Sequence, residues 1–133
     1  MYIFGRTIRI RYDRFKLSLI MYIYNAELIR VIDGDTIEAM VDLGFHTWQK
    51  VTVRLYGINA PESRTKDLEE KERGLAAKKR LTELLKDGKF MLESQGIGKY
   101  GRCLGDIYIQ EDSTEVNVNY RLIEEGHATE YKD

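Results

Sequence analysis

Apolar and polar residues alternate from Thr47 to Tyr56, and this pattern predicts a β-strand with one buried face. Val53 and Leu55 fall on the apolar side of the strand, whereas Arg54 falls on the opposite side. Four further segments are rich in β-branched and aromatic residues and are bounded by turn residues. They predict strands over Tyr22–Ile32, Thr36–Leu43, Phe90–Glu93 and Cys103–Gln110.

The segment Lys66–Lys86 changes to helical periodicity, with leucines recurring on one side and charged residues covering the rest. The leucine stripe consists of Leu68, Leu75, Leu81, Leu84 and Leu85. Asp87-Gly88 is expected to end this helix, because glycine readily adopts the backbone conformation that follows a helix. A second, shorter helix is expected over Asn119–Glu125, with Gly126 after it.

Five short strands, three of them before the first helix, predict an α+β domain that is mainly β: a small β-barrel with two or three packed helices. Residues 22–133 form this domain. Residues 1–21 are a basic N-terminal extension, because residues 1–20 hold five basic residues and one acidic residue, whereas the rest of the chain holds 16 and 21. The extension is expected to be disordered or to form an edge strand, and a basic arm on nucleic acid is the alternative.

Composition narrows the class of protein. The chain of 133 residues suits one domain, and its nine Tyr, four Phe and one Trp argue against disorder. No apolar run approaches the roughly 18 residues of a membrane helix, and no secretory signal is present, so an intracellular location is expected. A single cysteine excludes an internal disulfide, and two histidines make a zinc site unexpected. Cys103 and Trp48 are expected in the core.

Three segments carry side chains that suit chemistry on a phosphate. Asp33–Thr36 (DGDT) by itself predicts a hairpin turn. Arg54–Glu62 joins an arginine, an amide and a carboxylate after a strand, and Gly98–Arg102 places a basic and an aromatic residue between glycines. Each segment alone is explained by a turn or by solvated charge. Together they supply hard oxygen ligands for Ca²⁺ or Mg²⁺, a carboxylate that can accept a proton from water, and two arginines for a phosphate.

In this order, the segments Ile32–Ile37 (IDGDTI), Val53–Glu62 (VRLYGINAPE) and Lys99–Arg102 (KYGR) resemble the staphylococcal, or thermonuclease-like, nuclease family. The resemblance runs from about Asn25 to about Glu130. It implies a five-stranded OB-fold type barrel with helices packed on it, in agreement with the strands and helices expected from the residue pattern.

The resemblance also implies a metal site. Asp35 matches a carboxylate ligand of the catalytic Ca²⁺, and Ala60 falls where the family uses a backbone carbonyl as a ligand. Asn59 stands where the best-known members have a second metal-binding aspartate, so this site is expected to bind metal more weakly. Asp33 matches an acidic position just outside the metal ligands.

The remaining matches concern the reaction and the substrate. Glu62 matches the carboxylate that orients or deprotonates the attacking water, and Arg54 and Arg102 match the two arginines that hold the scissile phosphate. Asn119 matches a structural asparagine. Substrate contacts are implied for Lys99, Tyr100 and Tyr131.

The resemblance thus implies a metal-dependent nuclease that hydrolyses phosphodiester bonds in DNA, with RNA as a further substrate, at low sequence specificity and with 3′-phosphate products. Ca²⁺ is the implied cofactor, with Mg²⁺ or Mn²⁺ as alternatives. The competing interpretation is a catalytically weak or inactive domain that binds nucleic acid or protein. Asn59 favours the binding domain, as does the excess of acidic residues after residue 20. The presence of all four side chains Asp35, Arg54, Glu62 and Arg102 favours the nuclease. A monomer without a membrane partner is expected, and a dimer through residues 1–21 stays open.

Overall fold

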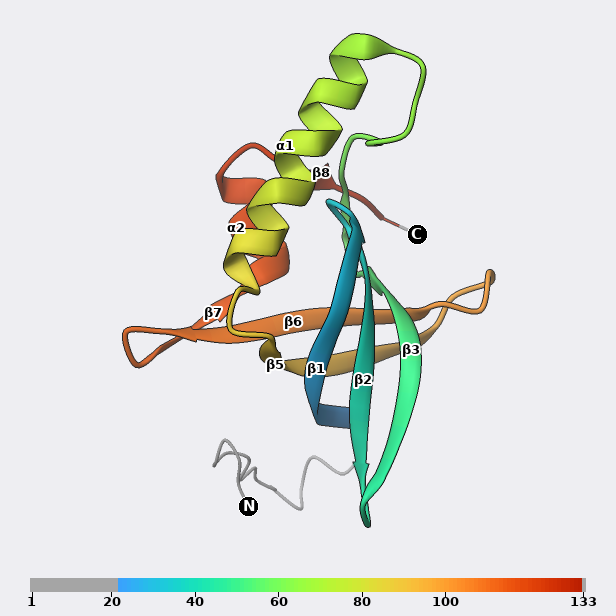
Figure 1. Cartoon of the computed structure of the whole chain (residues 1–133), viewed down its shortest axis with the longest axis vertical. Helices are drawn as coiled ribbons and strands as arrows, with labels where there is room; N and C mark the ends of the chain where they lie inside the picture. The colour runs from blue at the N-terminus through green and yellow to red at the C-terminus, as the bar shows by residue number, and fades with distance from the viewer. Residues whose placement is uncertain (1–21, 133) are drawn as a thin grey trace.

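The computed structural model describes residues 22–132, so the expectations for residues 1–21 lie outside the described part of the chain. Five long strands curl into a barrel in the order β3-β2-β1-β5-β6, and a parallel pairing of β3 with β6 closes it (Figure 1). These strands are β1 (Tyr22–Asp33), β2 (Thr36–Gly44), β3 (Thr47–Leu55), β5 (Lys89–Ile97) and β6 (Cys103–Glu111). The expected five-stranded barrel, mainly β, is confirmed.

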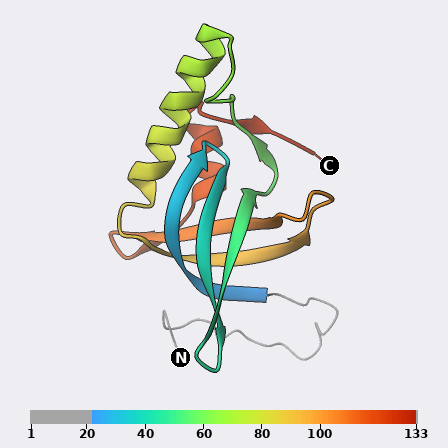
Figure 2. The same cartoon turned by 45° about the vertical axis from the view of Figure 1, so that its right-hand side comes forward.

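Two helices and three short strands complete the domain. The helices are α1 (Leu68–Leu84) and α2 (Val118–Glu124), and the short strands are β4 (Ile58–Asn59), β7 (Thr114–Asn117) and β8 (Thr129–Glu130). Both helices lie together at one end of the barrel, and the β2–β3 hairpin projects from the other end (Figures 1 and 2). Neither described helix is long and apolar enough to cross a membrane.

The ends of several elements differ from the sequence-based expectation. Strand β3 stops at Leu55 rather than Tyr56, because the chain turns at Gly57, whose φ of +79° suits glycine. Strand β5 continues to Ile97, four residues beyond the expected end at Glu93, so the connection to β6 is short. The short strands β4, β7 and β8 were not predicted, since two to four residues carry too little alternation to be recognised.

Helix α1 buries only part of the leucine stripe that the sequence indicates: Leu81 and Leu84 are buried, as is Leu85 just after the helix. Leu68 is 77% exposed and Leu75 is 48% exposed, so their assignment to the buried stripe was wrong. The buried side consists of Gly74, Ala77, Leu81 and Leu84. Small residues are needed there because the helix lies directly on the backbone. A Cβ on Gly74 would overlap the carbonyl group of Glu62 and would lie 2.7 Å from the amide nitrogen of Ser63.

The barrel interior holds the side chains that the alternation of β3 places inward. Val53 and Leu55 are fully buried, and Cys103 is buried as expected. Burial raises the pKa of the Cys103 thiol, so this group stays protonated and is a packing residue rather than a nucleophile. Trp48 is 42% exposed, so its expected place in the core was wrong. It shares the even positions of β3 with Arg54, and even positions face outward.

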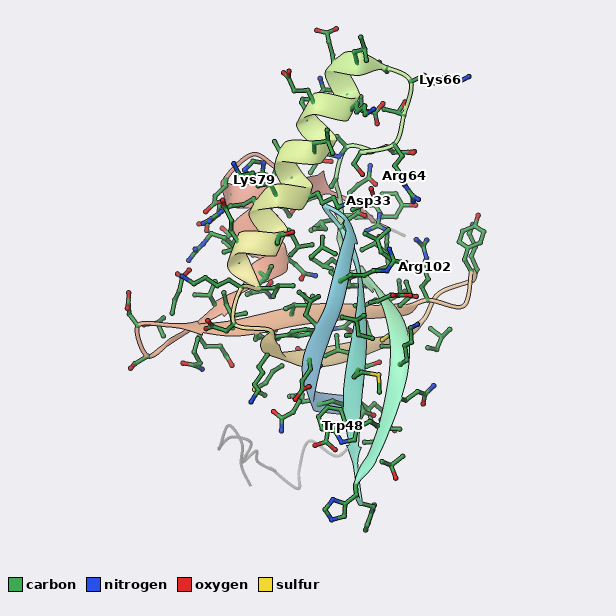
Figure 3. The ribbon with its side chains drawn as sticks, viewed as in Figure 1. Asp33, Trp48, Arg64, Lys66, Lys79 and Arg102 are labelled. Atoms are coloured by element: carbon green, nitrogen blue, oxygen red, sulfur yellow. The ribbon has the colours of Figure 1, made fainter. Side chains whose placement is uncertain are left out.

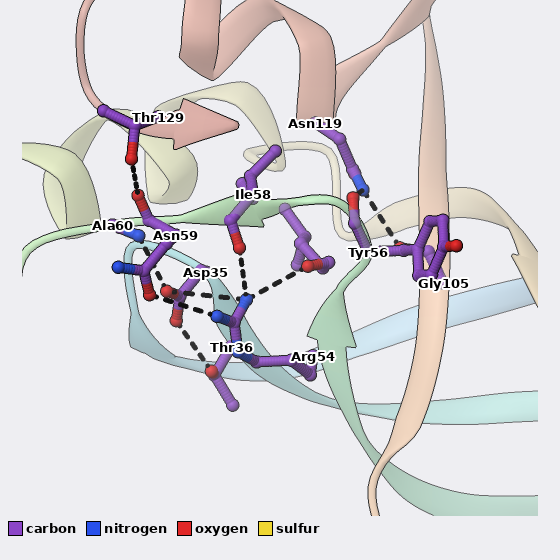
Figure 4. Close-up of polar contacts among 11 residues, drawn as sticks. Asp35, Thr36, Arg54, Tyr56, Ile58, Asn59, Ala60, Gly105, Asn119 and Thr129 are labelled. Carbon is purple, nitrogen blue, oxygen red and sulfur yellow. Dashed lines mark hydrogen bonds and ion pairs between the residues drawn. The ribbon is translucent and has the colours of Figure 1, made fainter. Parts of the chain in front are cut away.

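The buried side chain of Asn119 joins three parts of the fold. Its Oδ1 accepts a hydrogen bond from the amide of Ile107 at 3.2 Å. Its Nδ2 donates to the carbonyl oxygens of Tyr56 at 2.9 Å and Gly105 at 3.1 Å (Figure 4). Helix α2 is therefore tied to β6 and to the turn after β3, which is the structural role implied for this asparagine.

Candidate active site

A cavity of about 470 Å³ opens beside the point where β3 meets β6. Three segments line it: the turn from Arg54 to Asn59, the β5–β6 loop and the chain after β8. The parallel pairing of β3 with β6 places Arg54 opposite Leu104 and so brings the first two segments together. Six of the residues singled out from the sequence line this cavity, namely Arg54, Asn59, Lys99, Tyr100, Arg102 and Tyr131.

The guanidinium group of Arg54 is held by the turn that follows its own strand. Its Nη1 donates to the carbonyl oxygens of Leu55 at 3.0 Å and Ile58 at 2.8 Å, and its Nη2 donates to Oδ1 of Asn59 at 3.2 Å (Figure 4). Nη1 also lies 3.6 Å from Oδ2 of Asp35. The side chain is only 15% exposed, so its orientation is fixed before any ligand arrives.

Asp35 lies behind Arg54, in the two-residue turn that joins β1 to β2. It is 8% exposed, and both of its oxygens have donors. Oδ1 accepts a hydrogen bond from Oγ1 of Thr36 at 2.9 Å, and Oδ2 accepts one from the amide of Ala60 at 2.8 Å. Arg54 neutralises this buried carboxylate, and the bond to Ala60 ties the hairpin to β4.

The residues expected to bind metal suit a hard divalent cation by the chemistry of their donors. Asp35 and Asn59 come from separate segments, yet an oxygen of each side chain faces the same guanidinium group. Together they provide one carboxylate and one amide oxygen, which are donors that Ca²⁺ and Mg²⁺ accept. Among residues 22–132 no three His, Cys, Asp or Glu side chains gather in a metal-binding cluster. The donors of Asp35 and Asn59 therefore offer a metal ion little negative charge.

Glu62 is exposed and lies outside the residues that line the cavity. Its backbone is held in place, whereas its side chain faces solvent. The amide of Glu62 donates to Oε2 of Glu70 at 3.1 Å, and its carbonyl group packs against Gly74. The next residue, Ser63, is buried and donates a hydrogen bond to Oδ1 of Asp33.

Asp33 thus acts within this brace, which consists of Asp33, Ser63, Glu70 and Gly74. Its Oδ2 also lies 3.9 Å from Nη2 of Arg64. Figure 3 shows Asp33, Arg64 and Arg102 near the same end of β1–β3, with Trp48 toward the other end. Sequence reasoning missed Ser63, Glu70 and Gly74. A glycine inside a helix costs about 1 kcal/mol relative to alanine, so Gly74 was the available signal of a close contact.

Aromatic rings and cations stand together at the cavity. The ring of Tyr100 has the Lys99 ammonium at 5.4 Å and the central guanidinium carbon of Arg102 at 5.8 Å from its centroid. The central guanidinium carbon of Arg54 lies 5.9 Å from the centroid of Tyr131. Tyr131 is held there because its amide donates to the carbonyl oxygen of Gly57 at 2.8 Å. The cavity therefore offers flat apolar surfaces next to positive charge, an arrangement that suits a nucleotide.

A model of the family described as "Staphylococcal nuclease homologue" matches residues 52–133, which include all of the cavity-lining segments. The chain belongs to this family. Among similar proteins, the "Micrococcal nuclease" of Shigella flexneri is 31% identical over 114 residues, which cover 82% of this chain and 59% of that protein. The "Protein ParB" of Escherichia coli is 33% identical over 80% of this chain and 56% of its own length.

The "Endonuclease YncB" of Bacillus subtilis is 35% identical over 107 residues, which cover 78% of this chain and 46% of that protein. This staphylococcal nuclease homologue therefore spans about half the length of the curated relatives that it matches. The resemblance expected from the sequence motifs is confirmed. Two of the three motifs lie inside the matched residues, whereas the hairpin that carries Asp33 and Asp35 precedes them.

Proposed function

We propose that this chain is a metal-dependent nuclease that hydrolyses phosphodiester bonds in DNA, accepts RNA as a further substrate, and leaves 3′-phosphate ends with little sequence preference. One observation carries the proposal: Arg54 and Arg102 line the same cavity, and the guanidinium group of Arg54 is already fixed. The names of two relatives, a micrococcal nuclease and an endonuclease, support the same class of reaction.

Arg54 keeps donors for a phosphate. A guanidinium group has five N–H donors, and the hydrogen bonds to Leu55, Ile58 and Asn59 use three of them. Among residues 22–132, the Nε–H and one Nη2–H have no hydrogen-bond partner. These two neighbouring donors suit a two-point contact with phosphate oxygens. Arg102, which lines the same cavity from the β5–β6 loop, would supply further donors.

Glu62 is the carboxylate proposed to accept a proton from the attacking water. The water oxygen bonds to phosphorus, the bond from phosphorus to the 5′ oxygen breaks, and that oxygen takes up a proton from solvent as it leaves; Glu62 then returns its proton to solvent. A 3′-phosphate and a 5′-hydroxyl result. The brace described above fixes the backbone of Glu62, while its exposed side chain can turn toward a substrate seated in the cavity.

Asp35, Asn59 and the backbone carbonyl of Ala60 would hold a divalent cation, with Ca²⁺ proposed first and Mg²⁺ or Mn²⁺ as alternatives. A bound cation would neutralise negative charge on a phosphate oxygen. Because both side-chain oxygens contact Arg54, the arginine and the cation would share the same two residues. Arg54 and the cation would each supply positive charge for the phosphate.

The proposal is tested by digesting plasmid DNA, single-stranded DNA and RNA with Ca²⁺, with Mg²⁺, with Mn²⁺ and with a chelator. Cleavage is expected with a divalent cation and not with the chelator, and the products are expected to resist a 3′ exonuclease until a phosphatase is added. Binding of nucleic acid without cleavage under every condition would identify the chain as a binding domain instead.

Asn59→Asp is expected to lower the cation concentration needed for half-maximal cleavage by about tenfold, because affinity at oxygen sites rises with the number of carboxylates. The thermal midpoint without metal is expected to change little, since Nη2 of Arg54, 3.2 Å from Oδ1 of Asn59, would pair with the new charge. Metal titrations of cleavage rate and of thermal midpoint measure both effects. Asn25→Asp, at an exposed position on β1, is the control. Equal metal dependence in the parent and Asn59→Asp would place residue 59 outside the metal ligands.

A further inference from the structure

A row of outward side chains on β3 leads away from the cavity. Arg54 lies at the cavity, and every second residue before it faces the same side of the strand: Thr52, then Lys50, then Trp48. The side chain of Lys50 is 62% exposed, and Trp48 is 42% exposed. At about 3.3 Å per residue, the row from Arg54 to Trp48 is roughly 20 Å long.

The flank of this row is open. Strand β3 pairs with β2 from Thr47 to Arg54, but it pairs with β6 only from Val53 to Leu55. Within residues 22–132, no strand covers the other edge of β3 between Thr47 and Thr52. Figure 1 shows this part of β3 at the outer side of the barrel. A long ligand in the cavity could therefore continue along β3 without meeting another strand or helix of the described residues 22–132.

Near the row, the basic side chains of Arg30 and Lys50 are more exposed than the acidic side chain of Glu38. Glu38, across the sheet on β2, has a side chain only 17% exposed and lies between two cations. Nε of Arg30 donates to it at 2.8 Å, and the ammonium of Lys50 lies 3.9 Å from it. The hydrogen bond from Arg30 lowers the pKa of Glu38, so the carboxylate stays ionised and holds both cations near the row. Asp42, opposite Trp48, accepts a hydrogen bond from the amide of Gly44.

We infer that this row is a binding track for the part of a single nucleic-acid strand that extends beyond the cavity, with Lys50 contacting a phosphate and Trp48 stacking on a base. Proteins bind single strands by combining a cationic path for the backbone with aromatic side chains for the bases. The inference rests on the proposed function for what occupies the cavity. It adds that the strand extends toward the β2–β3 hairpin, and that single strands are preferred because their bases are free to stack.

Trp48 is the single tryptophan of the chain, so its fluorescence reports on the far end of the track. In a chelator, which prevents the proposed cleavage, a dinucleotide is expected to leave the emission unchanged and a ten-nucleotide single strand is expected to quench it. Loss of one stacking contact is expected to weaken binding of the longer strand about 5- to 150-fold in Trp48→Leu. Anisotropy of a labelled strand measures this affinity in both proteins.

Lys50→Gln is a second variant, which leaves the reporter in place and is expected to reduce both affinity and quenching. Matched controls lie on the helices: Tyr120→Leu on α2, where Tyr120 is 60% exposed, and Lys79→Gln on α1. Neither control is expected to change binding. Near-ultraviolet and far-ultraviolet circular dichroism show whether each variant keeps the parent fold.

The outcomes separate this inference from the proposed function. Cleavage of long strands with unchanged Trp48 emission and unchanged affinity in both β3 variants would overturn the track and leave the nuclease in place. Binding with quenching but no cleavage would keep the track and overturn the nuclease. Emission that changes with protein concentration in the absence of nucleic acid would assign this face to a contact between two copies of the chain, and the track would be wrong.

Discussion

Arg54→Lys is expected to reduce the rate of phosphodiester cleavage by about 10²- to 10³-fold, the usual effect of removing a preorganised donor from an active site. Lysine keeps the positive charge beside Asp35, but it lacks the planar fork that contacts two phosphate oxygens at once. It also cannot reproduce all the hydrogen bonds to Leu55, Ile58 and Asn59. A loss of about 1–3 kcal/mol in the free energy of unfolding is therefore expected as well.

Arg102→Lys separates the two effects. Arg102 lines the same cavity from the β5–β6 loop, and its guanidinium group contacts the ring of Tyr100 rather than the backbone of the barrel. This variant is expected to lose a similar fraction of activity with little change in stability. Arg73→Lys, on the exposed side of α1, is expected to change neither. Single-turnover rates at saturating metal, together with urea unfolding, measure both quantities. Normal cleavage by both cavity variants would contradict the role of the arginines.

Gly74→Ala is expected to destabilise the domain and to lower activity, although alanine favours a helix by about 1 kcal/mol over glycine. The added Cβ would overlap the carbonyl group of Glu62, and a backbone group cannot rotate away as a side chain can. Overpacking of this kind commonly costs about 1–3 kcal/mol. Separation of α1 from the chain at Glu62 would also disturb the hydrogen bond between the Glu62 amide and Glu70.

Two further variants test whether Gly74 affects activity through the backbone position of Glu62. Glu62→Gln removes the proton acceptor without changing the backbone, so it is expected to lower the rate by about 10²- to 10⁴-fold at unchanged stability. Ala76→Gly, on the exposed side of α1, is expected to lose about 1 kcal/mol of stability at unchanged activity. Thermal midpoints and cleavage rates are measured for all three variants. A Gly74→Ala protein that is more stable than the parent and fully active would show that the brace does not position Glu62.

The barrel was predictable because its signals are local. Alternation identified β3, and Asp33–Thr36 marked a turn that the structure contains, with Asp33 paired to Thr36 across it. Hydrophobicity predicted the buried Leu81 and Leu84 of α1 but not the first half of the buried side, because small residues stand where the helix touches backbone. Leu75 is apolar yet half exposed, whereas Gly74 beside it is buried. The expected core position of Trp48 was wrong because even positions of β3 face outward, although aromatic residues are commonly buried.

The grouping of the candidate site was only partly visible in the sequence. The order of the motifs indicated which side chains belong together, and the cavity contains six of them. The contacts between motifs depend on tertiary structure. No sequence pattern predicts the hydrogen bond from Arg54 to Asn59, or the one from the amide of Ala60 to Asp35. The brace formed by Asp33 and Ser63 joins residues that are distant in sequence, and a single serine carries no periodic signal.

The closing pair of β3 and β6 determines when the site can exist during folding. Val53 and Cys103 meet there across the interval that contains α1 and β5, so the pairing carries one of the larger loop-closure entropies in the domain. Contacts between distant segments generally form late and set the folding rate. Arg54 and Arg102 line one cavity only after this closure. A chain whose β6 has not yet docked thus lacks the cavity altogether, and the proposed activity is expected to appear only after the barrel has closed.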